Sequence, residues 1–292
     1  MKRLLGLLLG SLLLATALPA RAYTPPVLRV GFTPWENPKD LSQVVTPMVD
    51  LLSKATGMRV QPYVATDYAG VIKGMGAGKV DVAFLPPGGA ILAEKTAHGK
   101  ILLKSQTKGR SAYYSVIITL KDSHLKNLRD LKGQTFAFVD PASTSGGIYP
   151  RLLMLNNGLN PERDFKQVIY AGDHDSVVLA VLHGKVDAGA TYANNPAGTD
   201  SHWMRKLSPD ERARIRILAI SKPIPTDTLT TRSDLDPHIV GAIRKTFLTL
   251  SATPAGQARI RSVYKVDGFM PVGPRDYDPV REAFTKVGLT IK

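Results

Sequence analysis

The chain lacks cysteine altogether, which excludes disulfide bonds, a thiol nucleophile, a cysteine-based metal site and a lipid-bearing cysteine. Beyond the N-terminal 22 residues it also lacks an apolar run of the roughly 20 residues that a membrane-spanning helix needs. Its six histidines are scattered and show no metal-ligand spacing. We therefore expect a soluble mature chain that carries no metal and no cofactor.

The N-terminal segment has the composition of a secretory leader. Lys2 and Arg3 precede an uncharged apolar run, Leu4–Leu18, and Ala20–Ala22 supplies small residues at the two positions that a signal peptidase reads. The run has about 15 residues and is short for a membrane anchor, which is the alternative. The pattern predicts a Sec-type signal peptide over residues 1–22, cleaved after Ala22, and a periplasmic mature protein.

Acidic residues are scarce relative to basic ones, and the net charge is +14. The leader contributes three basic residues and no acid, which leaves +11 for the remaining 270 residues. Such an excess is compatible with nucleic acid, an anionic surface or an anionic ligand. Export argues against nucleic acid, and so does the absence of a basic run interleaved with aromatic residues. A solvated surface that weakly steers anions is the simplest interpretation.

Apolar periodicity alternates between strand and helix along the first third of the chain. The expected order is a strand over 27–32, a helix capped by Asp40 and ending at Gly57, a strand over 58–64, a helix over 67–75 and a strand over 80–85. This alternation is typical of parallel sheets covered by helices. The mature length is also typical of two lobes of about 100 to 150 residues each.

A repeated segment supports two similar lobes. Gly78–Ala83 reads Gly-Lys-Val-Asp followed by small residues, and Gly184–Gly189 repeats this 106 residues later, each time after a helical pattern. Chance similarity of a common helix-to-strand turn is the alternative. The strand-like run 113–120 is expected to cross into the second lobe, and residues 223–230 are expected to return.

We accordingly predict a first lobe of residues 23–117 plus 226–292 and a second lobe of residues 118–225. Near the C-terminus, Asp236 and Thr253 are expected N-caps, each followed by proline at the first helical position. The helices that they begin are expected to pack on the first lobe.

The strongest candidate site follows a buried strand over residues 135–140. The hydroxyl residues Ser143, Thr144 and Ser145 come next, followed by two glycines and a helix. Unpaired backbone N–H groups and the helix dipole favour an anion at such a position, and ligands bind beyond the carboxyl ends of strands in open α/β sheets. Ordinary capping is the alternative, but it needs only one hydroxyl residue.

These residues carry a family resemblance that extends, in order, over nearly all of the mature chain. The segments concerned are Thr66–Tyr68, Val80–Leu85, Lys132–Gly146, Tyr170–Asp175, Gly184–Ala190 and Ile224–Asp227. Together they resemble the phosphonate-, phosphite- and phosphate-binding proteins of ABC transporters. The resemblance implies a two-lobed type II periplasmic binding protein. Each lobe would be a mostly parallel sheet flanked by helices, with two crossover strands as the hinge.

The resemblance also implies a ligand site. Its residues would be Ser143, Thr144, Ser145, His174, Tyr68 and Asp227. The three hydroxyl residues and the histidine would donate hydrogen bonds to the phosphoryl oxygens, and the tyrosine would reach across the cleft. The aspartate matches an acid that family members use for a ligand amino group, although a protonated P–OH would serve it equally well.

Two departures from the family pattern concern the same site. The family usually has a pocket tyrosine in the turn after the third strand, where this chain has Ala90. An acid that grips the aminoalkyl group in some members falls on Asn194, which places strong selectivity for amines in doubt. Trp35 and Glu36 are possible substitutes.

The expected function is capture of a small phosphorus oxyanion by hinge closure of a monomer, which then meets an ABC permease. A ligand-presenting sensor module is one alternative, and the same fold with a sulfonate, sulfate or carboxylate is another. Hydrolysis is disfavoured because the chain has no Gly-x-Ser-x-Gly elbow. A phosphate loop at residues 74–79 is rejected because it follows a helix and lacks the Ser or Thr that holds magnesium.

Overall fold

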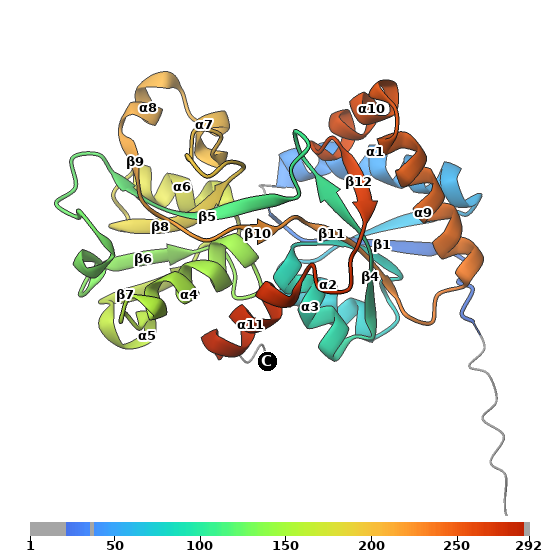
Figure 1. The fold of residues 1–292 in the computed structure, drawn as a ribbon, viewed down its shortest axis with the longest axis horizontal. Helices are drawn as coiled ribbons and strands as arrows, with labels where there is room; N and C mark the ends of the chain where they lie inside the picture. The colour runs from blue at the N-terminus through green and yellow to red at the C-terminus, as the bar shows by residue number, and fades with distance from the viewer. Residues whose placement is uncertain (1–21, 36–37, 289–292) are drawn as a thin grey trace, which may run out of the picture.

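The computed structural model describes residues 22–35 and 38–288. The expected signal peptide, except for Ala22, and Glu36 therefore lie outside the described residues. Two lobes lie side by side, each with a sheet and flanking helices (Figure 1). The α/β, two-lobed architecture expected from the sequence is thereby confirmed.

The first lobe contains one sheet with strand order β12-β4-β11-β3-β1-β2. Its elements are β1 (Leu28–Phe32), α1 (Pro38–Thr56), β2 (Val60–Val64), α2 (Tyr68–Gly76), β3 (Val82–Leu85), α3 (Pro87–Thr96), β4 (Gly99–Gln106), β11 (Thr228–Arg232), α9 (Pro237–Ser251), α10 (Pro254–Tyr264) and β12 (Gly268–Pro271). Helix α1 begins at Pro38, so Asp40 lies inside the helix and the expected start there was wrong. The N-caps Asp236 and Thr253 are confirmed, and α9 and α10 pack on α1 and β12 of this lobe.

The second lobe has strand order β10-β5-β8-β6-β7, and β9 pairs with β5. Its elements are β5 (Ala112–Leu120), the 3-10 turn Leu128–Leu131, β6 (Thr135–Phe138), the π-turn η2 (Thr144–Ile148), α4 (Tyr149–Asn156), α5 (Pro161–Asp164), β7 (Gln167–Tyr170), α6 (His174–Leu182), β8 (Ala188–Ala193), α7 (His202–Lys206), α8 (Pro209–Ala213), β9 (Ile215–Ile220) and β10 (Ile224–Pro225). The division expected at residues 117 and 118 falls within β5, which pairs with second-lobe strands on both sides of that position.

Both sheets are mixed, and the expectation of mostly parallel sheets was wrong. In each sheet the strands of the βαβ units run parallel: β3-β1-β2 in the first and β8-β6-β7 in the second. The strands that enter or leave each lobe, such as β5 and β11, pair antiparallel with their neighbours. The reason is that these strands belong to the crossovers and to the returning tail, and not to βαβ units.

The repeated Gly-Lys-Val-Asp segments adopt the same structure in both lobes. Gly78 and Gly184 take left-handed φ values of 67° and 63° after α2 and α6. The aspartates then bind the neighbouring parallel strand: Asp81 accepts from the backbone N–H of Arg29 in β1, and Asp187 accepts from that of Thr135 in β6, each at 2.8 Å. The repeat therefore marks βαβ units of the same local structure, one in each lobe.

The side of the molecule away from the cleft is held by a continuous apolar cluster. It contains Ile91 of α3 together with Ile148 and Tyr149 of the second lobe and Phe284 of α11 (Asp278–Val287). Helix α11 packs against both α3 and α4, and it lies beneath the junction of the lobes (Figure 1). This buried contact leaves the opposite, polar side of the junction as the place where the lobes separate.

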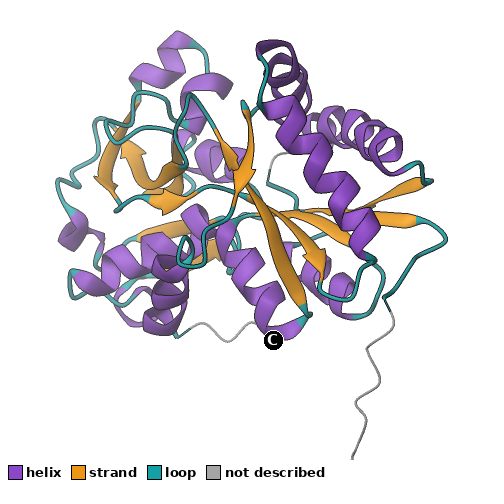
Figure 2. Cartoon of the chain, turned by 45° about the vertical axis from the view of Figure 1, so that its right-hand side comes forward, coloured by secondary structure: helices purple, strands orange, loops and turns teal. Residues whose placement is uncertain are grey.

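Figure 2 shows helices on the outer faces of both sheets. None of the helices within residues 22–35 and 38–288 is long and apolar enough to cross a membrane.

Candidate functional site

A cavity of about 290 Å³ lies between the two lobes. Its second-lobe wall is formed by Tyr113, Ser143, Ser145, His174, Tyr192, Asn194, Arg205 and Lys206. Its first-lobe wall includes Thr33, Trp35, Tyr68, Pro86, Ser105, Thr226, Asp227, Tyr264 and Lys265. Five of the six site residues that the sequence predicts thus line one cavity; Thr144 does not.

The predicted oxyanion turn begins directly after β6. Ser143 is its N-cap, and the Ser143 hydroxyl accepts a hydrogen bond from the N–H of Gly146 at 3.1 Å. The turn is closed as a π-turn by hydrogen bonds from the N–H of Ile148 to the carbonyl of Ser143 at 2.9 Å and from the N–H of Tyr149 to the carbonyl of Thr144. Pro150 has no N–H to bind the carbonyl of Gly146. That carbonyl instead accepts from the N–H of Val139 at 2.9 Å. The widened turn is therefore fastened to the end of β6.

Among the described residues, no partner is found for the backbone N–H groups of Thr144 and Ser145. The Ser145 side chain is 3% exposed and lines the cavity, while its carbonyl accepts from the Ser115 hydroxyl at 2.6 Å. Ser115 thus fixes the backbone of Ser145. Two N–H donors and the hydroxyls of Ser143 and Ser145 gather where the helix dipole is positive.

Thr144 differs from its two neighbours. Its side chain is fully buried, and its hydroxyl accepts from the N–H of Gly88 in the first lobe at 2.8 Å. The structure thus gives this hydroxyl a contact between the lobes, and its expected hydrogen bond to the ligand stays a prediction.

The two glycines of the turn serve packing. A Cβ on Gly146 would collide with the Val139 side chain, and one on Gly147 would collide with the main-chain carbonyl of Asp140. These positions therefore require glycine so that the turn can pack closely on the strand. They do not need it for the approach of a ligand.

Tyr68 and His174 occupy equivalent positions in the two lobes. Each is the first residue of its helix, α2 or α6, directly after an aspartate N-cap, Asp67 or Asp173. Each backbone N–H also donates across the junction: that of Tyr68 to the Asp140 carboxylate at 3.4 Å, and that of His174 to the carbonyl of Trp35 at 3.3 Å. Two equivalent helix starts thus meet face to face over the cavity.

The imidazole of His174 is neutral at physiological pH. The side chain is 4% exposed, and burial lowers its pKa well below the ordinary value, with a further contribution from nearby His202. Its Nδ1 lies 3.0 Å from the hydroxyl of Thr191. When that hydroxyl donates to Nδ1, Nε2 carries the proton and is the donor available to a ligand.

The phenol of Tyr68 is buried against second-lobe residues and lies near the side chain of Ser143. Burial raises its pKa well above the ordinary value, and nearby Asp140 adds to the increase. The phenol is therefore protonated and is a further hydrogen-bond donor at the oxyanion turn.

Asp227 lies between β10 and β11 on the cavity wall. Desolvation raises the pKa of its carboxyl group to about 7. Its negative charge raises the pKa values of the phenols of Tyr68, Tyr113 and Tyr264, which also line the cavity. A carboxyl group that carries a proton near neutrality can either donate to or accept from a phosphorus oxyanion.

Sequence reasoning missed Tyr113. This residue is the second of β5, and its buried phenol lies close enough to the side chains of Thr144 and Ser145 for them to oppose the rise of its pKa that burial causes. Its ring packs against the apolar cluster that contains fully buried Ala90, the position where the family usually has a tyrosine. The only signal in the sequence was the tyrosine itself at the start of an otherwise apolar strand.

The region near Asn194 was also only partly anticipated. Asn194 lines the cavity, and its side-chain amide donates to Asp200 at 3.3 Å. Tyr192, two residues earlier on β8, stacks edge-on to His174 with ring centroids 4.9 Å apart. Trp35 lines the cavity from the first lobe. Within residues 22–35 and 38–288, no group of three His, Asp or Glu side chains is placed to hold a metal ion.

Residues 30–277 match the family described as the periplasmic phosphonate substrate-binding protein of ABC transporters. The chain belongs to this family. It is 31% identical over 236 residues to the phosphonates-binding periplasmic protein of Escherichia coli, which covers 79% of this chain and 68% of that protein. It is 29% identical to the phosphate-import protein PhnD of Mycolicibacterium smegmatis, over 90% and 87% of the two chains.

Solved structures agree with this assignment to the phosphonate-binding family. A binding-protein component of an ABC phosphonate transporter from Pseudomonas aeruginosa has a TM-score of 0.80 and 27% identity, covering 90% of this chain and 87% of that one. PhnD1 of Prochlorococcus marinus in complex with methylphosphonate has a TM-score of 0.77 at 20% identity, covering 91% and 99%. The latter likeness concerns the fold. Members of the family are periplasmic substrate-binding components of ABC importers.

Proposed function

We propose that the interlobe cavity binds a small phosphorus oxyanion, a phosphonate, phosphite or phosphate, and that the closed form delivers it to the permease of an ABC importer. One observation carries the proposal. The inner end of the cavity gathers the hydroxyls of Ser143 and Ser145, the partner-free backbone N–H of Ser145, the neutral ring of His174 and the phenol of Tyr68. All of these groups donate hydrogen bonds without adding a full charge.

The donor set suits a tetrahedral anion in strength as well as in geometry. A hydrogen bond to a charged ligand contributes roughly 1.5 to 3 kcal/mol net. Four or five such bonds support micromolar or tighter binding, about 8 kcal/mol, after the costs of association. In the same proposal Tyr113 supplies the phenol that Ala90 lacks, and Asp227 shares a proton with a P–OH group.

Closure of the lobes is part of the proposal. The N–H groups of Tyr68, Gly88 and His174 bind acceptors in the opposite lobe, so the conformation seen here represents the closed form. A ligand that touches both walls would favour this form over an open one. The division into two lobes, with the first boundary before β5 instead of at residues 117 and 118, belongs to the proposal. So do the monomeric state and cleavage of a signal peptide after Ala22.

We further propose that the site binds without catalysis. The Nδ1 atom of His174 contacts a threonine hydroxyl and no carboxylate, so the orienting acid of a hydrolytic triad is missing from this histidine. A sensor module that presents the same ligand to a receptor remains the second candidate. A cleft with these donors would serve either partner.

A ligand panel tests the proposal. Phosphate, phosphite, methylphosphonate, 2-aminoethylphosphonate and sulfate are each added to the mature protein, and melting temperature and calorimetric affinity are measured. At least one phosphorus oxyanion should bind at micromolar concentration. Ser145→Ala combined with His174→Gln should weaken that binding at least about tenfold, because two donors are lost.

The matched control is Ser262→Ala combined with His238→Gln, on exposed positions of α10 and α9. It should leave the affinity unchanged. Binding of sulfate alone, or equal affinity of the double variant and the control, would contradict the proposal.

A further inference from the structure

The cavity extends beyond what the oxyanion turn requires. Its volume of about 290 Å³ is close to the lower end of the range of about 300 to 1,000 Å³ that is typical of small-molecule pockets, so it has room for a ligand larger than methylphosphonate. Its inner side chains are nearly inaccessible, with exposures of 2% for Ser143, 3% for Ser145 and 4% for His174. Other lining residues, among them Arg205 and Lys265, are exposed and form the outer end. A ligand therefore has a buried end and a second end among these exposed groups.

Two cations from opposite lobes line this outer end. Arg205 is at the end of α7, and its guanidinium donates to the phenol of Tyr192 at 2.8 Å and lies 5.6 Å from the centre of that ring. Lys265 caps α10 in a left-handed conformation with φ 58°. Neither forms an ion pair with a carboxylate among the described residues. Arg205 lies close enough to Asp200 to help lower the pKa of that acid, but Asp200 forms its ion pair with Lys108. Arg205, already oriented by Tyr192, and Lys265 can therefore both bind an anion.

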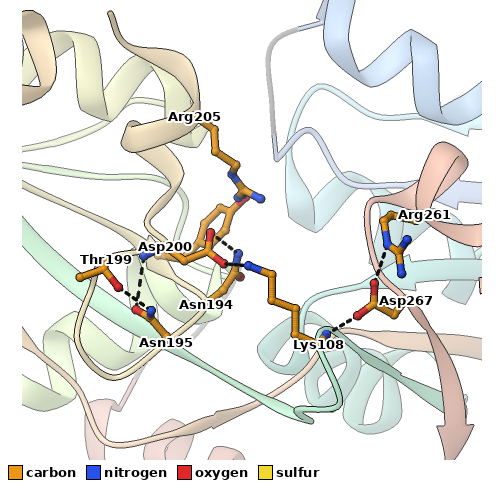
Figure 3. Close-up of polar contacts among 9 residues, drawn as sticks. Lys108, Asn194, Asn195, Thr199, Asp200, Arg205, Arg261 and Asp267 are labelled. Atoms are coloured by element: carbon orange, nitrogen blue, oxygen red, sulfur yellow. Dashed lines mark hydrogen bonds and ion pairs between the residues drawn. The ribbon is translucent and has the colours of Figure 1, made fainter. Parts of the chain in front are cut away.

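The neighbouring groups reinforce this positive potential. Lys206 also lines the cavity and is 3.4 Å from Asp175. Among the described residues of the lining, Asp227 is the one carboxylate, and it lies with the tyrosines of the inner end. The nearby acid Asp200 is engaged by Lys108 at 3.0 Å (Figure 3) and is not part of the lining.

Asn194 completes the pattern. It stands on the second-lobe side of the gap, below Arg205 in Figure 3, and donates its side-chain amide to Asp200. A neutral amide offers no counter-charge to a ligand ammonium. An ammonium group at this end would also face Arg205 and Lys265, at a cost from like-charge repulsion.

We infer that the preferred ligand is a phosphonate with a second acidic group, a phosphonocarboxylate, whose phosphoryl group occupies the oxyanion turn and whose carboxylate lies between Arg205 and Lys265. This inference rests on the proposed function and adds the ligand class. A guanidinium binds a carboxylate through two parallel hydrogen bonds, which gives both affinity and orientation.

The test compares three phosphonates that differ at the far end: 3-phosphonopropionate, propylphosphonate and 2-aminoethylphosphonate. Calorimetry on the mature protein should show 3-phosphonopropionate binding at least about tenfold more tightly than propylphosphonate, and 2-aminoethylphosphonate binding more weakly than either. Raised salt should reduce the advantage of the carboxylate, because the outer end is exposed.

Variants assign the effect to the outer end. Arg205→Gln should reduce the carboxylate advantage to about threefold or less, because it should weaken binding of 3-phosphonopropionate more than binding of propylphosphonate. Arg244→Gln, on the exposed face of α9, is the matched control and should leave both affinities unchanged. Asn194→Glu should shift the preference toward 2-aminoethylphosphonate.

The outcomes separate this inference from the proposed function. If 2-aminoethylphosphonate binds as tightly as 3-phosphonopropionate, or if Arg205→Gln weakens all ligands equally, the inference is overturned and the oxyanion site stands. If only phosphite or phosphate binds, the inference is likewise overturned and the oxyanion site stands. If no phosphorus oxyanion binds at all, the proposed function fails and the inference fails with it.

Discussion

At the scale of single residues, the site depends on polar groups that burial keeps uncharged. His174 is neutral, the phenols of Tyr68 and Tyr113 keep their protons, and Asp227 has a pKa of about 7. Buried donors without charge avoid the desolvation cost of an ion while the cavity is empty. An anion bound there would therefore meet neutral donors, with Asp227 as the one group of the inner end that is partly ionised near pH 7.

Asp227 gives a stability prediction. In the unfolded chain its pKa is near 3.8, and in the folded protein it is about 7, so the folded state binds this proton more tightly. The folded protein should therefore lose stability as pH rises from about 4 to about 7, by about 2–4 kcal/mol, since cavity water relieves part of the effect. Asp227→Asn removes the ionisation. In thermal melts without ligand, the melting temperature of the variant relative to that of the wild type should be higher at pH 8 than at pH 4. A difference in melting temperature that is the same at both pH values would contradict the raised pKa.

Tyr113 gives a binding prediction. Tyr113→Phe removes only the hydroxyl that contacts Thr144 and Ser145, so phosphonate affinity should fall about tenfold, the equivalent of one hydrogen bond to a charged ligand. Calorimetry measures the effect, and Tyr114→Phe, the next residue along β5, is the control. Equal affinities of the two variants would show that Tyr113 does not replace the tyrosine missing at Ala90.

At the scale of elements, the sequence predicted the βαβ units and the oxyanion turn well. The repeated Gly-Lys-Val-Asp segments and the alternating periods depend on local sequence, so the strands and helices were found within a few residues. The roles of Thr144 and Tyr113 could not be predicted, because each depends on a contact with a distant segment: Gly88 for the first, the oxyanion turn for the second. The sequence also could not show that the carbonyl of Gly146 binds the N–H of Val139, because this contact exists only once the turn lies beside the end of β6.

Two glycine-to-alanine substitutions, one in the oxyanion turn and one in α9, should change the stability of the protein in opposite directions. Gly147→Ala places a Cβ against the carbonyl of Asp140 and should destabilise the protein by about 1–3 kcal/mol, as overpacking does. Gly241→Ala, inside α9 with open space around it, should stabilise by about 0.5–1 kcal/mol. Chemical denaturation measures both. A neutral Gly147→Ala would mean that the turn does not pack on β6 as described.

The crossover from β4 to β5 is a second element with a testable role. Lys108 and Gly109 form a tight turn, with φ values of 51° and 69°, and the backbone N–H of Lys108 binds Asp267 in the first lobe. The Lys108 ammonium reaches Asp200 of the second lobe at 3.0 Å (Figure 3). This residue therefore connects both lobes at the edge of the cavity.

Loss of this connection should favour the open form modestly. The pair is partly exposed, and such pairs contribute about 0.2–1 kcal/mol. Lys108→Gln should therefore weaken ligand binding by about two- to fivefold at low salt, with a smaller effect at high salt, whereas Lys126→Gln on the second lobe should have none. Calorimetry at two salt concentrations checks this. A salt-independent loss would show that the ion pair does not set the closed form.

At the scale of the whole molecule, two similar lobes share a buried apolar cluster on one side and meet across polar helix starts on the other. The cluster includes Ile91, Ile148 and the C-terminal helix α11, and the backbone donors of Tyr68 and His174 bind across the polar side. In the proposed function the apolar contact would persist as the hinge, and the ligand would act on the polar side alone. A small anion could then control the position of two large lobes.

The central claim is that the interlobe cavity holds a phosphorus oxyanion at the turn of Ser143 and Ser145. A crystal structure of the mature protein with its tightest-binding phosphonate tests this most directly. The account predicts phosphoryl oxygens within hydrogen-bond distance of both hydroxyls, of Nε2 of His174 and of the free N–H groups of the turn. A phosphonate bound elsewhere, or a cavity filled by the protein's own side chains while the phosphonate is bound, would contradict it.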